Sequence, residues 1–485
     1  MNPMAARPSA LFTDFYSLTM SHGYWKKGMN NRAVFEMFFR RQPFAGGFSI
    51  FAGLDTLLDS IGSFRFSPDD IAYLRGLALF EEGFLEYLRD FRFSGSLWAM
   101  DEGQVVFPQE PLLRIDGGLI EGQLLEGLIL NIINFQSLIA TKTARVWLAS
   151  GRGSVMEFGL RRAQGPDGAM SASRAAFIGG ACGTSNVLAG KTFGIPVLGT
   201  MAHSWVMSFP CEEAAFQTYA DIFPMHPVFL IDTYDTLRSG APNAIKVGKR
   251  LAETGKTFGV RLDSGDIHYL AVEVRKMLDA AGLREATISV SNDLDESIIQ
   301  TLTDAEAPIN AWGVGTRMVT GASEAAFTGV YKLIAKDEAG KLLPAIKCSD
   351  NPEKTTTPGI KQVWRILDAQ GMAVADVMDR DEGGGVERIR LGARYTFWHP
   401  SADYRHFTHI PEGSAEPLLK LRLDQGGPVA ARPSLEDIRR LVKKNLDAFD
   451  PSYKRILYPH IYKVSITEQL RDIKLALIKN FLGDL

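Results

Sequence analysis

Polar side chains stand at the ends of six short apolar runs in the middle of the chain. In chain order these residues are Arg161 and Arg162, His203 and Ser204, Asp232, Arg261 with Asp263 and Asp266, Asn292 with Asp293, and Gly313 with Gly315 and Thr316. Guanidinium groups bind phosphates and carboxylates, whereas carboxylates bind hydroxyl groups or a divalent cation. One polar strand end can simply meet solvent, but six together predict a binding site for an anionic substrate.

Glycine spacing indicates phosphate groups in that substrate. In GVGT, Gly313 and Gly315 leave successive backbone N–H groups open to a phosphate, and the Thr316 hydroxyl adds a donor. A second glycine-rich stretch, GGACGTSN at 179–186, precedes a predicted helix whose N-terminus favours an anion. The two stretches together predict a substrate with two phosphate groups.

His203 lies in GTMAHSW, at the end of an apolar run and between Thr200 and Ser204. A histidine in this position can be a hydrogen-bonded structural residue, a general base, a metal ligand or a phosphate acceptor. Spacing alone does not separate these alternatives, and all of them stay open at this point.

The six apolar runs predict the strands that position these side chains. They are VMEFGLR ending at Arg161, PVLGTMAH ending at His203, FLIDTY ending at Tyr234, TFGVRLDS ending at Ser264, TISVSND ending at Asp293 and NAWGVGT ending at Thr316. Helical periodicity at 242–254, 266–281 and 295–306 separates several of them. This α/β alternation predicts a mostly parallel sheet, closed into an irregular βα barrel, with an open doubly wound sheet as the alternative.

The ends of the chain follow a different pattern from its middle. DFYSLTMSHGYWKKG predicts a helix, RAVFEMFFRR predicts a strand, and strand-like runs return after Gly329. We therefore expect an α+β N-terminal domain at 1–150 that is discontinuous and rejoined by about 330–400, around a catalytic barrel at 151–329. The segment 401–485 is expected to be a helical extension, with one helix capped by Ser434 and Asp437.

Composition excludes several classes of protein. The 485 residues carry 53 Lys and Arg against 56 Asp and Glu, a net charge of -3, without a basic run that could grip nucleic acid. Three cysteines without CxxC spacing argue against a disulfide framework or a zinc site. Because no signal peptide or uninterrupted apolar span stands out, we expect no membrane partner and a cytoplasmic location. The 46 glycines exceed average usage, in keeping with the turns described above.

These motifs together resemble the nicotinate phosphoribosyltransferase family, which has the type II phosphoribosyltransferase fold. The resemblance covers almost the whole chain. Its most specific parts are EFGLRRAQGPDG and GTMAHS, and it extends through TDFYSLTMSHGYW, FEMFFRRQPFAGGF, DTYDT, GVRLDSGD, SNDLDE and GVYKL. It implies transfer of 5-phosphoribosyl from its 1-pyrophosphate to the ring nitrogen of nicotinate, yielding nicotinate mononucleotide and pyrophosphate for NAD salvage. ATP as co-substrate, Mg²⁺ and a homodimer are implied with it.

The resemblance also implies roles for individual residues. Tyr16 would stack on the pyridine ring at a dimer interface, and Arg261 beside Thr200 would pair with the nicotinate carboxylate. His203 would be phosphorylated by ATP, and Thr316 would hold the phosphoribosyl phosphate. The remaining expected site residues are Asp263 and Asp293 for ribose hydroxyls, with Asp263 also for Mg²⁺, Arg161 and Gly315 for substrate anions, and Arg40, Lys347 and Lys361 for the pyrophosphate.

Two alternatives remain at the level of sequence. A nicotinamide phosphoribosyltransferase would have the same fold and chemistry but take a neutral amide. A catalytically silent regulator that binds nucleotides is a second alternative, although the joint presence of Arg261, His203, Asp263 and Thr316 argues against it. In the glycine-rich stretch, Ala181 and Cys182 replace the bulky residue and the acid of many relatives, so the detail of this loop is not carried over.

Overall fold

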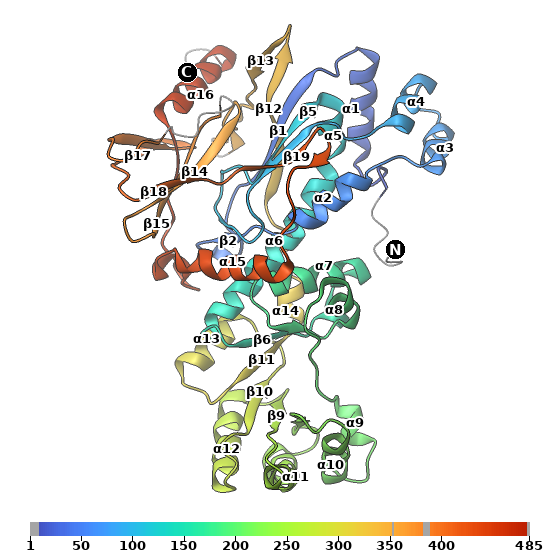
Figure 1. Ribbon diagram of the computed structural model, residues 1–485, viewed down its shortest axis with the longest axis vertical. Coiled ribbons are helices and arrows are strands. Elements are labelled where there is room, and N and C mark those ends of the chain that lie inside the picture. The colour runs from blue at the N-terminus through green and yellow to red at the C-terminus, as the bar shows by residue number, and fades with distance from the viewer. Residues whose placement is uncertain (1–8, 352–353, 382–388, 483–485) are drawn as a thin grey trace. The chain divides into compact units, whose positions relative to one another are not determined.

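The computed structural model describes residues 9–351, 354–381 and 389–482, and the chain divides into two compact units (Figure 1). Unit 1 comprises Met1–Leu138 and Ala326–Leu485, and unit 2 comprises Ile139–Ala325. The chain passes from unit 1 to unit 2 inside helix α6 (Glu126–Ala149). The boundary expected after residue 150 therefore coincides with the end of that helix, whereas the two units divide within it.

Unit 2 is built on a six-stranded parallel sheet in the order β7-β6-β11-β10-β9-β8. Its strands are β6 (Ser154–Glu157), β7 (Gly183–Thr184), β8 (Val228–Leu230), β9 (Gly259–Leu262), β10 (Thr287–Val290) and β11 (Ala311–Val314). From β8 to β11, strands consecutive in sequence are neighbours in the sheet, as in a βα repeat. The expected mixed α/β fold with a parallel sheet is thus confirmed.

Helices fill the connections between these strands. They are α7 (Gly165–Ile178), α8 (Val187–Phe193), α9 (His203–Met207), α10 (Glu212–Ile222), α11 (Ala241–Glu253), α12 (Ile267–Ala280), α13 (Glu296–Asp304) and α14 (Thr316–Val319), with short turns η2 (Leu160–Arg162) and η3 (Thr236–Gly240). The three helices expected from periodicity correspond to α11, α12 and α13, and α12 packs against β9 and β10. In Figure 1, α11 and α12 lie below strands β9 and β10.

Two strand expectations need correction. The run from 196 to 203 is not a strand in the described residues: it forms one bridge, Thr184 to Val197, and His203 already begins α9. The two-residue strand β7 lies in the stretch that was expected to be a glycine-rich turn, and it pairs with β6. Among the described residues the ladder also stays open between β7 and β8, so the barrel is irregular in that its hydrogen bonding does not close.

Unit 1 contains a seven-stranded sheet that joins distant parts of the chain. Its order is β13 (Lys341–Pro344), β12 (Gly329–Glu338), β1 (Arg32–Phe39), β5 (Leu113–Gly118), β3 (Ser96–Ala99), β19 (Lys420–Asp424) and β20 (Gly427–Pro428). The predicted strand RAVFEMFF is β1, which is buried from Ala33 to Phe39 and pairs with β12 on one side and β5 on the other. The segment after Gly329 therefore does rejoin the N-terminal sheet.

A second large sheet of unit 1 corrects the expectation of a purely helical extension at 401–485. Its order is β17 (Ala402–His409), β16 (Tyr395–His399), β21 (Val464–Ile466), β15 (Ala373–Arg380), β14 (Lys361–Leu367) and β18 (Ser414–Pro417). The two predicted helices are present as α15 (Leu435–Asp447), with the Ser434 and Asp437 capping box, and α16 (Glu468–Leu482). The segment 401–485 therefore contains strands as well as helices. Strands β17, β18 and β20 lie at sheet edges, and β21 lies inside the second sheet.

The other described elements of unit 1 are mostly helices and short turns. Its remaining elements are α1 (Phe15–Lys26), α2 (Leu54–Ser63), α3 (Pro68–Gly76), α4 (Glu82–Asp90), α5 (Leu119–Leu124), η1 (Pro43–Ala45), η5 (Pro451–Lys454) and the pair β2 (Ser49–Ile50) and β4 (Val105–Val106). The predicted N-terminal helix is α1. Across the described ranges, none of the helices has the length and apolarity needed to cross a membrane.

Candidate functional site

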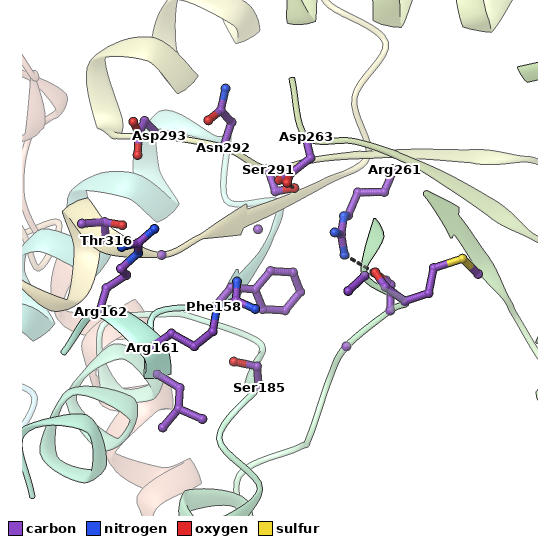
Figure 2. Close-up of a pocket in the computed structure, with 17 residues that line it drawn as sticks. Phe158, Arg161, Arg162, Ser185, Arg261, Asp263, Ser291, Asn292, Asp293 and Thr316 are labelled. Atoms are coloured by element: carbon purple, nitrogen blue, oxygen red, sulfur yellow. Dashed lines mark hydrogen bonds between the residues drawn. The ribbon is translucent and has the colours of Figure 1, made fainter. Parts of the chain in front are cut away.

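A pocket of about 440 Å³ lies at the carboxyl ends of the strands of unit 2 (Figure 2). Seven of the predicted site residues line it: Arg161, Thr200, Arg261, Asp263, Asp293, Gly315 and Thr316. Their convergence follows from the parallel sheet, because the carboxyl ends of all its strands meet at one edge. The structure thus brings together most of the polar strand ends that the sequence singled out. Four of those residues do not line the pocket: His203, Ser204, Asp232 and Asp266.

Arg161 and Arg162 reach the pocket from the short turn η2, directly after β6. Both side chains are exposed, and within the described part of the chain neither guanidinium has a carboxylate partner. In Figure 2 both arginines lie on the same side of the pocket as Thr316. Two unpaired guanidinium groups beside a glycine loop form a local positive field that suits a phosphate-bearing ligand.

Arg261 provides the third cation, from the end of β9. Its Nη1 donates to the Thr200 hydroxyl, and its buried Nε has no hydrogen-bond partner. Burial lowers the pKa of Arg261, and the neighbouring carboxylates of Asp263 and Asp232 oppose that shift. A largely buried guanidinium with an unused N–H leaves a bonding position that a ligand carboxylate can complete.

Asp263 stands at the centre of a polar network. One of its oxygens accepts from the Ser291 hydroxyl, and its backbone N–H donates to Asp232 at 2.9 Å. The other oxygen, Oδ2, lies 3.7 Å from Nε2 of His203. His203 itself is about 40% exposed, and its Nδ1 lies 3.2 Å from the Thr233 hydroxyl. The predicted histidine therefore lies close to the pocket residue Asp263, with its ring within hydrogen-bond distance of the Thr233 hydroxyl.

The loop after β10 carries backbone strain at the pocket. Asn292 has a φ of 109°, a value that side-chain-bearing residues rarely adopt, and both Asn292 and Asp293 line the pocket. Asp295, two residues on, caps α13 and accepts a hydrogen bond of 2.7 Å from Arg317, the neighbour of Thr316. The carboxylate loop and the GVGT loop are thus linked by an ion pair.

Tyr16 and Arg40 belong to unit 1, so the pocket of unit 2 does not include them. Tyr16 lies on α1 and is about half exposed, while burial and the Glu126 carboxylate raise its pKa to about 12. Arg40 follows β1 and has a buried Nε without a partner. Arg40 and Lys347 are close enough to help lower the pKa of Lys332, although burial is the larger cause. Unit 1 therefore has a cluster of cations of its own, formed by Arg40, Lys332 and Lys347.

The expectation that Lys361 neutralises pyrophosphate is wrong. Its side chain is 2% exposed, and its Nζ pairs with Glu36 at 2.7 Å while donating to the carbonyl groups of Thr357 and Gly359. All its donors are therefore engaged inside unit 1. Lys347, by contrast, is exposed.

The stretch 179–186 also differs from expectation, since only Ser185 of this stretch lines the pocket. Gly179 lies against the Ala140 carbonyl, and Gly180 lies against the Trp147 ring, so neither has room for a side chain. These glycines permit close packing on α6, and the interpretation as a second phosphate cradle is not supported.

Some pocket residues were missed by the sequence argument, notably Phe158, Ser185 and Ser291. Phe158 directly follows β6 inside EFGLRR, so its position after a strand end was the available indication. Ser185 and Ser291 are small polar residues beside β7 and β10, where nothing in sequence distinguishes them from ordinary turn residues.

The pocket suits a metal ion that is held partly by substrate phosphates and not by protein side chains alone. Among the described residues there is no cluster of three or more His, Cys, Asp or Glu side chains that could hold a metal ion. Mg²⁺ is commonly held by one or two carboxylates together with substrate phosphates. Asp263 and Asp293 line the same pocket and match that donor set.

This fold and site define an α/β enzyme that acts on a phosphorylated, anionic substrate. Three family models match the chain: the nicotinate phosphoribosyltransferase N-terminal domain at 11–134, the nicotinate phosphoribosyltransferase family at 154–371 and the nicotinate phosphoribosyltransferase C-terminal domain at 360–474. The nicotinate phosphoribosyltransferase of Bacillus subtilis is 42% identical over 97% of this chain and 95% of its own length. The human one is 36% identical over 97% and 96%.

Solved structures agree with these sequence matches. The crystal structure of human nicotinic acid phosphoribosyltransferase has a TM-score of 0.83 and 34% identity, covering 96% of this chain and 99% of its own. Nicotinate-nucleotide pyrophosphorylase from Pyrococcus furiosus, at a TM-score of 0.70 and 23% identity over 92% of this chain and 97% of its own, shares the fold. The chain belongs to the nicotinate phosphoribosyltransferase family and is an enzyme of this type.

Proposed function

We propose that the pocket of unit 2 binds 5-phosphoribosyl 1-pyrophosphate and nicotinate together and joins them. The observation that carries this is Arg261: a buried guanidinium with an unused Nε, beside the Thr200 hydroxyl, suits the carboxylate of nicotinate. Membership of the nicotinate phosphoribosyltransferase family supports the same choice. A neutral amide would offer the open Nε an uncharged acceptor, which makes a weaker hydrogen bond than a carboxylate does.

The remaining lining residues divide the chemistry between them. The backbone of Gly315 and the Thr316 hydroxyl hold the 5-phosphate, and Arg161 and Arg162 neutralise pyrophosphate. As the pyridine nitrogen forms its bond to C1 of the ribose, the bond from C1 to the pyrophosphate oxygen breaks and its electron pair leaves with that oxygen. Positive charge that develops at C1 is stabilised by the carboxylates of Asp263 and Asp293.

Mg²⁺ is the expected cofactor, and Asp263 and Asp293 are the residues that would hold it with the pyrophosphate. When bound, it would neutralise the leaving group. Asp263 already accepts from Ser291 through one oxygen, which leaves Oδ2 for a metal or for His203.

His203 is the residue through which ATP hydrolysis would couple to synthesis. Its ring is accessible and lies beside Asp263, so a phosphoryl group on it would add negative charge next to that carboxylate. Repulsion between the two would favour a different arrangement of the loop that begins α9. ATP would then change the conformation of the pocket rather than supply atoms to the product.

A homodimer would bring the cations of unit 1 into the reaction. Tyr16 is half exposed on α1, and the Arg40 group has an unsatisfied buried N–H, as expected for side chains that meet a second molecule. In this proposal Tyr16 of a second copy stacks on the pyridine ring, and Arg40 binds pyrophosphate with Lys347.

Product formation with each pyridine base tests the substrate. The purified chain is mixed with 5-phosphoribosyl 1-pyrophosphate, Mg²⁺, ATP and either nicotinate or nicotinamide, and release of pyrophosphate and ADP is measured. We expect turnover with nicotinate. A preference for nicotinamide would overturn the substrate, and no pyrophosphate with either base would support a silent regulator.

The phosphohistidine is tested with His203→Ala. We expect slow synthesis that no longer responds to ATP, together with loss of acid-labile phosphate on the protein. His268→Ala, on the exposed surface of α12, is the matched control and should keep both properties. Unchanged stimulation by ATP in His203→Ala would rule the phosphohistidine out.

Whether the site is shared between two copies is tested by mixing two variants of low activity. Arg261→Ala removes a residue of unit 2, and Tyr16→Ala removes one of unit 1. If the site uses both copies, mixed dimers regain part of the activity because one of their two sites is intact. No recovery after subunit exchange, or a monomer by light scattering, would contradict the shared site.

A further inference from the structure

Glu157, the last residue of β6, is a buried carboxylate of unit 2. Its side chain is 1% exposed, and in the described part of the chain no lysine, arginine or histidine pairs with it. Three donors surround it instead: the backbone N–H of Gly159, the Ser173 hydroxyl at 2.9 Å and the Thr184 hydroxyl at 2.5 Å. A buried carboxylate without a counter-charge is costly and needs all of these bonds.

The donors around Glu157 come from elements that form separate walls of the pocket. Gly159 begins the turn η2, which carries Arg161 and Arg162. Thr184 ends β7, and the next residue, Ser185, lines the pocket and donates its backbone N–H to the carbonyl of Glu157 at 2.9 Å. One carboxylate therefore ties two pocket walls to the end of β6.

The same turn packs against the loop that follows β11. A Cβ atom on Gly159 would overlap the Val319 side chain of α14, so this contact requires glycine. The N–H of Phe158 donates to the Val314 carbonyl at 2.8 Å, and Gly315 lies beside the Phe158 carbonyl. The position of the turn thus determines how closely the arginines approach Gly315 and Thr316, and Figure 2 shows Arg162 near Thr316.

We propose that Glu157 is a positioning residue for the known reaction. It fixes the spacing between the arginines of η2 and the GVGT loop, and so sets the affinity for 5-phosphoribosyl 1-pyrophosphate. It does not touch the substrate, and its hydrogen bonds do not involve Arg261 or Thr200. This inference rests on the proposed assignment of the η2 and GVGT side to phosphate and of Arg261 to nicotinate.

Glu157→Gln tests the proposal with a side chain of nearly the same size and shape. A glutamine oxygen cannot accept all three bonds, so the turn should relax while the hydroxyl contacts adjust. We expect the KM for 5-phosphoribosyl 1-pyrophosphate to rise about tenfold or more, and that for nicotinate to change less than about twofold. Thr184→Val removes one of the three donors, together with the acceptor of the Asn186 N–H, without altering charge. It should produce a smaller shift in the same direction. Thr184→Val is informative even if Glu157→Gln does not fold.

Glu296→Gln is the matched control. Glu296 is also a buried carboxylate of unit 2, paired with Lys142 at 2.5 Å and Arg145 at 2.9 Å, but it does not line the pocket. Its loss should lower the melting temperature and leave both KM values in place. The proposal is overturned if Glu157→Gln and Thr184→Val leave the KM for 5-phosphoribosyl 1-pyrophosphate unchanged, or if Glu296→Gln shifts it equally.

Arg261→Ala in the same assay separates this inference from the proposed function. If Arg261→Ala raises the KM for nicotinate but Glu157→Gln leaves both values alone, only the role of Glu157 fails. If Arg261→Ala leaves the KM for nicotinate alone, the assignment of the two sides of the pocket fails instead.

Discussion

The buried ion pairs of unit 1 and the pocket of unit 2 treat charge in opposite ways. In unit 1, Lys361 pairs with Glu36 at 2.7 Å, and Arg365 pairs with Asp376 at 2.9 and 2.6 Å, all with side chains at most 5% exposed. In the pocket of unit 2, by contrast, Arg161 and Arg162 have no carboxylate partner within the described ranges. Arg261 Nε is buried there without a hydrogen-bond partner, and so is Oδ1 of Asp232, whose other oxygen accepts from the Asp263 N–H.

The difference teaches how to tell a charge that serves folding from a charge that serves a ligand. Removing water from a charged group is costly, and pairing the group internally offsets part of that cost. A buried donor that is left open in the protein can be completed by a ligand. The Nε of Arg40 meets this second criterion within unit 1, which sets it apart from Lys361.

Replacing Arg261 should have the largest effect. Arg261→Ala removes the proposed partner of the nicotinate carboxylate, and we expect kcat/KM for nicotinate to fall about 100- to 1,000-fold. The KM for 5-phosphoribosyl 1-pyrophosphate should change little, and steady-state kinetics with both substrates measures this. Arg261→Lys keeps the charge but not the planar fork, and it should recover only part of the loss. An unfolded Arg261→Ala would place Arg261 among the folding charges.

The buried charges of unit 1 should show the reverse behaviour. Asp376 accepts from Arg365 and, at 3.1 Å, from the Tyr462 hydroxyl, so Asp376→Asn should lower the free energy of unfolding by about 3 kcal/mol. Burial, and then the Asp376 carboxylate, raise the pKa of the neighbouring Glu110 well above its usual range. Glu110→Gln should therefore cost less than about 1 kcal/mol. Urea unfolding compares the two, and equal losses would mean that Glu110 is ionised.

Lys474 of α16 is a buried charge of unit 1 whose effect can be tested by the pH dependence of the free energy of unfolding. Its Nζ donates to the Pro400 carbonyl at 2.6 Å, and burial lowers the pKa of Lys474 to about 8. Because an unfolded lysine keeps its proton to higher pH, the unfolded chain binds more protons above pH 8. The free energy of unfolding should then rise from pH 8 to 10, by on the order of 2 kcal/mol.

Lys474→Met should abolish that rise and stabilise unit 1 at pH 7, as judged by urea titrations at both pH values. Lys479→Met, at an exposed position of the same helix, is the control and should keep the rise. A rise that survives in Lys474→Met would assign it to other groups.

The smallest expected effect concerns backbone strain beside the pocket. Glycine adopts the φ of Asn292 without strain, so Asn292→Gly should raise stability by up to about 1 kcal/mol and keep activity. Asn292→Ala keeps the strain and should lower both. Thermal melts and turnover measure the pair. Equal loss of activity in the two variants would show that the Asn292 side chain itself binds substrate.

Much of the pocket could be predicted from sequence because its residues follow strands. Apolar runs such as GVRL and AWGV end where the chain turns into the pocket, so Arg261, Asp263 and Thr316 could be placed at one edge without coordinates. Their individual roles, the bound ions and the dimer remain predictions. Strands β9, β10 and β11 stop before the predicted runs end, and residues that directly follow each of them line the pocket.

Other features depend on contacts between distant residues, which no local pattern indicates. Lys361 on a strand reads as a surface lysine until Glu36, more than 300 residues away, is placed beside it. Strand β7 has two residues, too few for any periodicity. In β17, the run ADYRHFTH is mostly exposed and polar, so the C-terminal segment read as helical although it pairs along β16.

The pairing of β1 with β12 has a consequence for synthesis on the ribosome. β1 ends at Phe39, and its partner begins at Gly329, about 290 residues later. At roughly 5 to 20 residues per second, the nascent chain waits on the order of half a minute with one edge of β1 unpaired. Unit 2, complete at residue 325, can fold during that wait. Chaperones that cover exposed strand edges should therefore matter more for the co-translational folding of unit 1 than for that of unit 2.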